Sequence, residues 1–200
     1  MFASKEGEIL ALTAAFCWAI SSISFSKAGR RVGSLPVNII RLATAMAFLA
    51  ALNAVVRHKW VPTDAGVHNW VWLSLSGFVG FFLGDLFLFR AFVMIGPRLS
   101  TLLMTLAAPV AAITGRLWID ERIGWYSLVG MAVTITGVSW VVMERPMDKD
   151  GKVIHVAPLG VLYGALGATG QGVGLVLGKI GMRPSFAGAL ATDSVALSRL

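Results

Sequence analysis

Long apolar runs constrain the fold of this chain more than any other feature of its sequence. A helix needs roughly 17 to 25 such residues to cross the hydrocarbon core of a bilayer. Six runs reach that length, and a seventh begins near residue 186. They cover residues 8–26, 35–56, 70–93, 99–117, 124–143 and 156–178. Because the runs are long and lack apolar–polar alternation, they predict helices and not barrel strands.

The composition agrees with an all-α polytopic membrane protein that has about six complete helices and part of a seventh. Hydrophobic residues make up 56% of the chain and charged residues 14%, and the mean hydropathy is +0.77. A soluble domain carries far more charge. The 17 Lys and Arg residues lie mostly in short connections. We therefore interpret them as residues that flank the membrane, and we expect no nucleic-acid partner despite the net charge of +7. Trp residues near the ends of apolar runs suit the membrane interface: Trp60, Trp70, Trp72, Trp118, Trp125 and Trp140.

Small residues recur at helix-face spacing in nearly every run. The sixth run is the extreme case, with Gly170, Gly174 and Gly178 each four residues apart. Such stripes let helix backbones approach closely in a membrane. They predict a tightly packed bundle and do not by themselves indicate a ligand.

A weak internal repeat relates the first run to the sixth. Aligning their starts places Lys27 on Lys179 and Gly29 on Gly181, and "VNIIRL" at 37–42 then matches "VALSRL" at 195–200. The copies are five spans apart, an odd number, so the second copy enters the membrane from the opposite side. This predicts inverted repeats of five transmembrane helices, with residues 1–145 as the first repeat and 153–200 as the start of an incomplete second repeat.

The sequence resembles the EamA family of the drug/metabolite transporter superfamily. The resemblance covers the whole chain and rests on Arg41 inside the second run, Pro109 in "LAAPVAAITG", Glu121 in "WIDERIG" and the fifth run "LVGMAVTITGVSW". The usual Gly-Glu before the fifth span is Asp-Glu here, a departure that affects the turn more than any site. The resemblance implies a transporter with two inverted five-helix repeats, of which the second is truncated here.

The third run, "GFVGFFLGDLFLFRAF", contains two charges, Asp85 and Arg90. Five residues along a helix place them about 140° apart around the axis, so they cannot easily pair with each other. Arg41 in the antiparallel second run lies at a similar depth of roughly 9 to 10 Å. We therefore predict an Arg41–Asp85 ion pair that lines a cavity, and an Arg90 side chain that snorkels to the interface. A pair that only pins two helices together remains the alternative.

Three further residues are candidates near mid-membrane. Trp18 and Gln171 offer an aromatic wall and an amide for a small amphipathic solute, although either also suits helix packing. Pro109 removes a backbone hydrogen bond from the fourth span and predicts a helix kink. We expect Glu121 to cap the following helix, because a carboxylate is favourable at a helix N-terminus.

The leading hypothesis is a secondary transporter that moves a small metabolite or drug-like solute by alternating access. We expect a multi-pass protein of the cell membrane, the inner membrane in a bacterium, with the lipid bilayer and a small-molecule solute as partners. A homodimer is left open. No cofactor or metal is expected, since there is no P-loop and the three histidines lie in connections. The alternatives are a non-transporting packing or assembly protein, an inactive fragment, or a membrane-embedded enzyme, which is disfavoured because no histidine accompanies Cys17 or the membrane serines.

Overall fold

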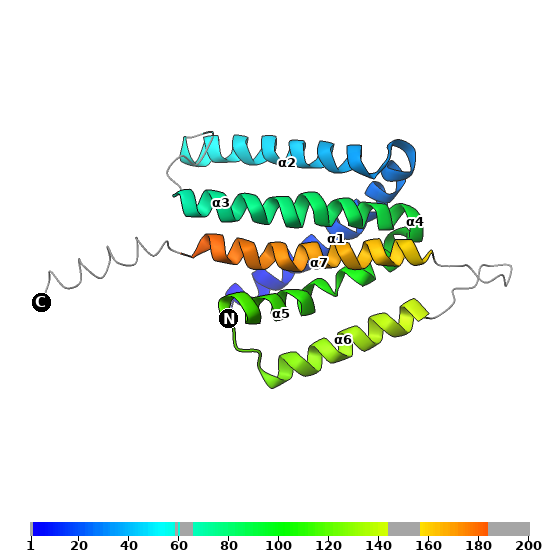
Figure 1. Cartoon of the computed structure of the whole chain (residues 1–200). Coiled ribbons are helices and arrows are strands. Elements are labelled where there is room, and N and C mark those ends of the chain that lie inside the picture. The colour runs from blue at the N-terminus through cyan, green and yellow to red at the C-terminus, as the bar shows by residue number, and fades with distance from the viewer. Residues whose placement is uncertain (1, 59, 61–65, 144–156, 184–200) are drawn as a thin grey trace, which may run out of the picture.

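The computed structural model describes residues 2–58, 60, 66–143 and 157–183, and these residues form helices without any strand (Figure 1). In chain order the elements are α1 (Phe2–Val32), α2 (Ser34–Arg57), α3 (Val67–Ser76), the π-helical segment η1 (Gly77–Gly84), α4 (Asp85–Met104), α5 (Ala107–Ile119), α6 (Trp125–Met143) and α7 (Pro158–Met182). The predicted all-α fold is confirmed. The predicted run from residue 186 lies outside the described residues.

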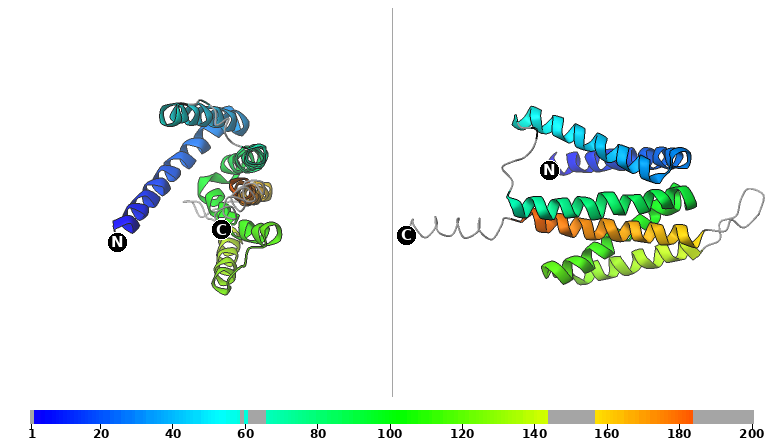
Figure 2. Two further views of the ribbon diagram at one scale, coloured as in Figure 1. Left: turned by 90° about the vertical axis from the view of Figure 1, so that its left-hand side faces the viewer. Right: turned by 45° about the horizontal axis from the view of Figure 1, so that its top comes forward.

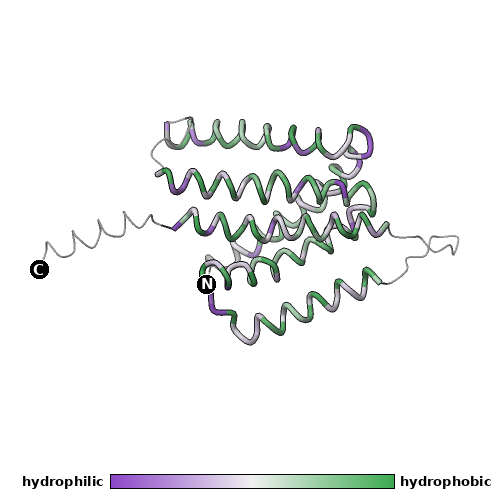
Figure 3. The backbone as a smooth tube through the Cα atoms, in the orientation of Figure 1, coloured by the Kyte–Doolittle hydropathy of each residue, from purple (hydrophilic) through white to green (hydrophobic). Residues whose placement is uncertain are grey.

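The described helices have the length and composition of membrane spans. Five are long and apolar enough to cross a bilayer, and α5 is a shorter apolar helix. Hydrophobic residues predominate along all of them, with hydrophilic stretches near the α1–α2 connection and before α6 (Figure 3). The five are Gly7–Val32, Ser34–Val56, Val67–Met104, Trp125–Met143 and Pro158–Met182.

The longest of these helices is two spans joined at a sharp turn. Gly96 has φ 80° and ψ 165°, and Pro97 follows it. Glycine adopts positive φ without steric penalty, and proline suits the first position of a new helix. The chain therefore reverses at Gly96 and returns toward α5 (Figure 1). The boundary predicted between residues 93 and 99 lies at this turn.

The returning helix is interrupted again before α5. Helical bonding stops at Met104, and Thr105 and Leu106 bond back to Leu102 O and Leu103 O, three residues earlier. Pro109 follows as the third residue of α5 and is buried. Because proline has no N–H, the Thr105 carbonyl loses its α-helical donor, which accounts for a discontinuity four residues ahead of the proline.

The helix α7 lies at the centre of the bundle. It packs against α3, η1 and α4 on one side and against α5 on the other, while α2 and α6 lie at opposite edges (Figure 1). The α1 helix contacts α2 and α4 through its C-terminal half, where Ser22, Ser26 and Gly29 are buried. Its N-terminal half leads away from the other helices (Figure 2).

Helices α1 and α7 run in opposite directions along the bundle (Figure 1). Opposite directions are what an inverted repeat requires, but any two helices that are an odd number of spans apart also run in opposite directions. Arg199, which the repeat aligns with Arg41, lies outside the described residues. The division into repeats at 1–145 and 153–200 therefore stays a prediction.

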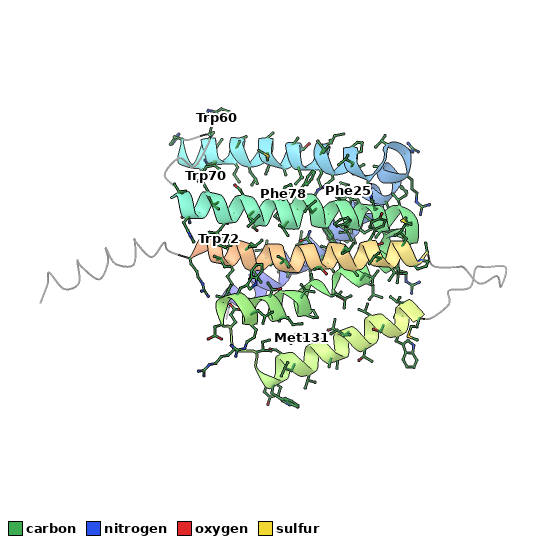
Figure 4. The ribbon with its side chains drawn as sticks, viewed as in Figure 1. Phe25, Trp60, Trp70, Trp72, Phe78 and Met131 are labelled. Carbon is green, nitrogen blue, oxygen red and sulfur yellow. The ribbon has the colours of Figure 1, made fainter. Side chains whose placement is uncertain are left out.

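Aromatic side chains mark both the core and one end of the bundle. Phe25 of α1 lies 5.0 Å from Phe89 of α4 between ring centroids, and they pack in the buried cluster with Val37, Leu88 and Phe92. Trp60, Trp70 and Trp72 gather at the end where α2 finishes and α3 begins (Figure 4). That position fits the interfacial role predicted for these three tryptophans.

Candidate functional site

The site is built around a wide helical segment packed against a glycine face. In η1 the backbone forms a π-helix, a rare form that occurs frequently at functional sites. It approaches α7 so closely that a Cβ at Gly174 would lie 2.7 Å from Gly80 Cα, and one at Gly170 would lie 2.8 Å from Gly84 Cα. The predicted packing role of the α7 glycines is confirmed. Asp85, the next residue after η1, is thereby held beside α7.

Asp85 is the centre of a buried polar cluster formed by three helices. Its side chain is 1% exposed. Arg41 of α2 forms an ion pair with Oδ2, and Gln171 Nε2 of α7 donates a hydrogen bond to Oδ1. The predicted Arg41–Asp85 pair is therefore present, and Gln171 joins it. Each carboxylate oxygen has a partner on a different helix, which satisfies a charge that is costly to bury alone.

The Arg41 side chain is only partly enclosed. It is 21% exposed, and its Cζ lies 5.4 Å from the centroid of the Phe89 ring, a cation–π distance. One terminal nitrogen bonds Asp85, but the buried Nε has no hydrogen-bond partner among the described residues. Arg41 therefore contributes a donor that the protein leaves unused.

Asn38 is a fourth member of the cluster that the sequence analysis missed. It lies one turn before Arg41 on α2 and is 0% exposed. Its Nδ2 donates to Phe82 O at 2.9 Å, whereas its buried Oδ1 has no partner in the part of the chain that the structure describes. The signal was present in the sequence: an amide three residues from an arginine shares its helix face. The cluster thus contains one free buried acceptor and one free buried donor on adjacent turns.

Side chains also bond the backbone along the seam between η1 and α7. Gln171 Nε2 lies 3.4 Å from Gly80 O, and Ser76 Oγ donates to Gly174 O at 2.7 Å. At the far end of α3, Asn69 Nδ2 donates to Gly181 O at 2.9 Å. These bonds fix α3 and η1 against α7, so the helices that carry Asp85 and Gln171 are held together along their length.

Two of the residues considered above lie apart from the cluster. Trp18 is 37% exposed at the middle of α1, and none of the described hydrogen bonds or ring contacts involves it. Its role as a solute-binding residue stays a prediction. Arg90 is exposed, as expected for a snorkelling side chain, and contacts Tyr163 of α7.

Glu121 does not cap α6, so that prediction is wrong. The first turn of α6 contains no acidic residue, because the helix begins four residues later at Trp125. Glu121 instead forms an ion pair with Lys179 near the end of α7. The cause lies in the turn: Asp120 adopts the left-handed conformation with φ 54° and ends α5, which directs the next side chain toward α7.

A comparison with known families gives the site its context. The EamA-like transporter family matches residues 5–143, which include most of α1, all of α2 to α6 and the residues Arg41, Asp85, Pro109 and Glu121. The chain belongs to the EamA-like transporter family. This family is part of the drug/metabolite transporter superfamily, so the EamA-like chain is a multi-pass integral membrane protein of the transporter type. No curated protein and no solved structure matches it.

Proposed function

We propose that this EamA-like chain acts in a secondary transporter that moves a small metabolite or drug-like solute by alternating access. The solute binds at the cluster of Asn38, Arg41, Asp85 and Gln171. The observation that carries this proposal is the burial of the Asp85 carboxylate between partners on two other helices.

Holding helices together with a buried ion pair carries a large desolvation cost. Desolvating two opposite charges costs several kcal/mol per ion, and well-packed apolar residues commonly serve equally well in a purely structural role. Within the described residues, Asn38 Oδ1 and Arg41 Nε also have no hydrogen-bond partners. A polar solute that supplies a donor to the first atom and an acceptor to the second would recover both hydrogen bonds.

Backbone discontinuities interrupt the helices that form the cluster and its surroundings, and they support a conformational change. The π-helical η1 ends at Asp85, the chain turns at Gly96, and a break at Thr105–Leu106 precedes Pro109. Broken helices near a midplane site are a recurrent feature of secondary transporters. Because the sequence has no P-loop, a solute or proton gradient is the proposed source of energy.

The test is solute flux into liposomes that contain the full chain, measured with a panel of small metabolites and drug-like compounds. For a solute that the wild type moves, we expect Asp85→Asn to reduce flux by about tenfold or more, because a lost charge-assisted hydrogen bond costs about 1.5 to 3 kcal/mol. The matched control is Asp120→Asn, which removes a carboxylate from an exposed ion pair with Arg116. It should transport like the wild type.

Two results would count against the proposal. Equal flux by the Asp85→Asn variant and the wild type would show that the cluster only pins helices. A wild-type chain that is folded, as judged by a single gel-filtration peak, yet moves no solute in the panel would favour the non-transporting assembly role.

A further inference from the structure

A second polar site lies at the end of the bundle where α1 meets α2. Here an open cavity of about 360 Å3 is bordered by three parts of the chain. Its volume falls in the range of small-ligand sites. The lining includes Gly33 and Ser34 from the α1–α2 turn, Arg90 and Val93 from α4, and Leu159 and Tyr163 from α7.

Arg90 is the distinctive residue of this cavity. Its Cζ lies 5.5 Å from the centroid of the Tyr163 ring, and its Nη1 lies 3.4 Å from the Tyr163 hydroxyl. Tyr163 is in turn stacked on Phe87, with ring centroids 5.9 Å apart. No carboxylate among the described residues pairs with Arg90. The guanidinium is therefore positioned by an aromatic stack but keeps its charge uncompensated.

Among the residues that the structure describes, the charge around this cavity is of one sign. Lys27, Arg30, Arg31 and Arg98 lie at the same end of the bundle as Arg90, as their places near the end of α1 and after the Gly96 turn show. The acidic side chains that the structure describes lie elsewhere. Glu8 is near the start of α1, and Asp120 and Glu121 precede α6 at the other end of the bundle. Asp85 is buried in the cluster.

Arg90 lies nearer the end of the bundle than Asp85 does. It lies six residues before the Gly96 turn, or about 9 Å along the helix axis, and Asp85 lies five residues, or about 7.5 Å, farther from that turn. Val93 and Leu159 add apolar surface beside the charge. A cationic group at this depth, next to apolar walls between helices, is the arrangement that binds phosphate-bearing lipid headgroups.

We propose that this cavity binds the phosphate group of an anionic amphiphile. Arg90 and the Tyr163 hydroxyl donate hydrogen bonds to the phosphate oxygens, since a guanidinium fork suits phosphate geometry. The apolar walls hold the first methylene groups of the attached chain. A membrane phospholipid and a soluble phosphate compound are the two sources of this chemistry, and the experiment separates them.

The experiment uses the full chain purified in a neutral detergent and native mass spectrometry to count bound molecules. Three probes are titrated: phosphatidylglycerol, phosphatidylcholine with matched acyl chains, and inorganic phosphate. We expect phosphatidylglycerol to bind more tightly than phosphatidylcholine, and Arg90→Gln to weaken that binding by about tenfold. Tyr163→Phe, which keeps the ring, should weaken it by a smaller factor.

The control variant is Arg98→Gln, which removes a positive charge from the same end without altering the cavity lining. It should bind phosphatidylglycerol within about twofold of the wild type, as expected for a screened surface charge. Binding of inorganic phosphate with the same dependence on Arg90 would assign the site to soluble phosphates. Equal losses in Arg90→Gln and Arg98→Gln, or binding that is insensitive to Arg90→Gln, would overturn the proposal.

Discussion

Asp85 and Arg90 lie five residues apart on one helix, yet the charge of Asp85 is buried and that of Arg90 is exposed. Asp85 is 1% exposed and has partners on α2 and α7. Arg90 is exposed, pairs with no described carboxylate and contacts the Tyr163 ring and hydroxyl. Residues five apart face different directions around a helix. Asp85 therefore faces α2 and α7 at the cluster, and Arg90 faces the cavity near the start of α7.

The difference shows two ways in which a membrane-spanning helix can accommodate a charged residue. A deeply buried charge requires a fixed opposite charge, because it cannot reach water. A long side chain nearer the interface can direct its charge toward the headgroups. The first arrangement should make stability sensitive to substitution, and the second should leave stability nearly unchanged. Each of the following predictions probes that contrast.

The largest effect is expected from Arg41→Gln. This change leaves Asp85 buried without its ion-pair partner, which typically costs about 3 to 5 kcal/mol. The free energy of unfolding in detergent, obtained by titration with a denaturing surfactant and followed by tryptophan fluorescence, measures the loss. Adding Asp85→Asn in the same chain should recover most of it. If the Arg41→Gln chain were as stable as the wild type, the buried ion pair would not contribute more to stability than the exposed charges.

The next effect concerns the glycine face that positions Asp85. In Gly174→Ala the new methyl group meets the Gly80 backbone at 2.7 Å, so the helices must separate, at a cost of about 1 to 3 kcal/mol. Gly137→Ala on α6 is the matched control, since nothing lies within 4 Å of its Cβ position. Thermal unfolding of the two purified variants should show a lower midpoint for Gly174→Ala alone. Equal midpoints would mean that the close approach is dispensable.

A smaller effect is expected at the exposed ion pair of Glu121 and Lys179. Its side chains are 36% and 55% exposed, so solvent screens the interaction. Glu121→Gln should change the free energy of unfolding by less than about 1 kcal/mol. The same surfactant titration measures it, and the difference from the wild type should shrink further at high salt. A loss as large as that of Arg41→Gln would show that exposure does not separate the two kinds of pair.

The smallest effect should come from Arg90→Gln. Removing an exposed charge without an ionic partner should change the free energy of unfolding by no more than about 0.5 kcal/mol. Circular dichroism during heating checks this. A marked destabilisation would indicate that Arg90 supports the fold. The exposed charge would then affect stability as the buried Asp85 charge does, against the prediction.

Several features of the fold and site followed from the sequence. Run lengths predicted the helices, and the depths of Arg41 and Asp85 in antiparallel spans predicted their pairing. The Gly170 and Gly174 spacing predicted the close packing of α7. These predictions succeed because bilayer thickness and helical rise fix depth directly.

Other features could not be predicted because they depend on rotation about helix axes. The π-helical η1 advances through a smaller angle per residue, so it changes which residues face α7 after Gly84. A projection as a regular α-helix therefore could not show that Gln171 would meet Asp85. Trp18 was predicted to line the cavity from its depth alone; it is 37% exposed at the middle of α1, and its role in solute binding stays a prediction. Depth is readable from this sequence, whereas the direction a residue faces depends on packing.

The most direct test of the central claim is solute flux through the neutral double variant Arg41→Gln/Asp85→Asn in liposomes. Asp85→Asn keeps the size of the side chain, Arg41→Gln shortens it, and both keep groups that can hydrogen-bond, so the helices should stay together. If the charges serve transport, the variant will be folded and will move the solute at least about tenfold more slowly than the wild type. Flux equal to that of the wild type would show that the buried pair serves only to join α2 to α4.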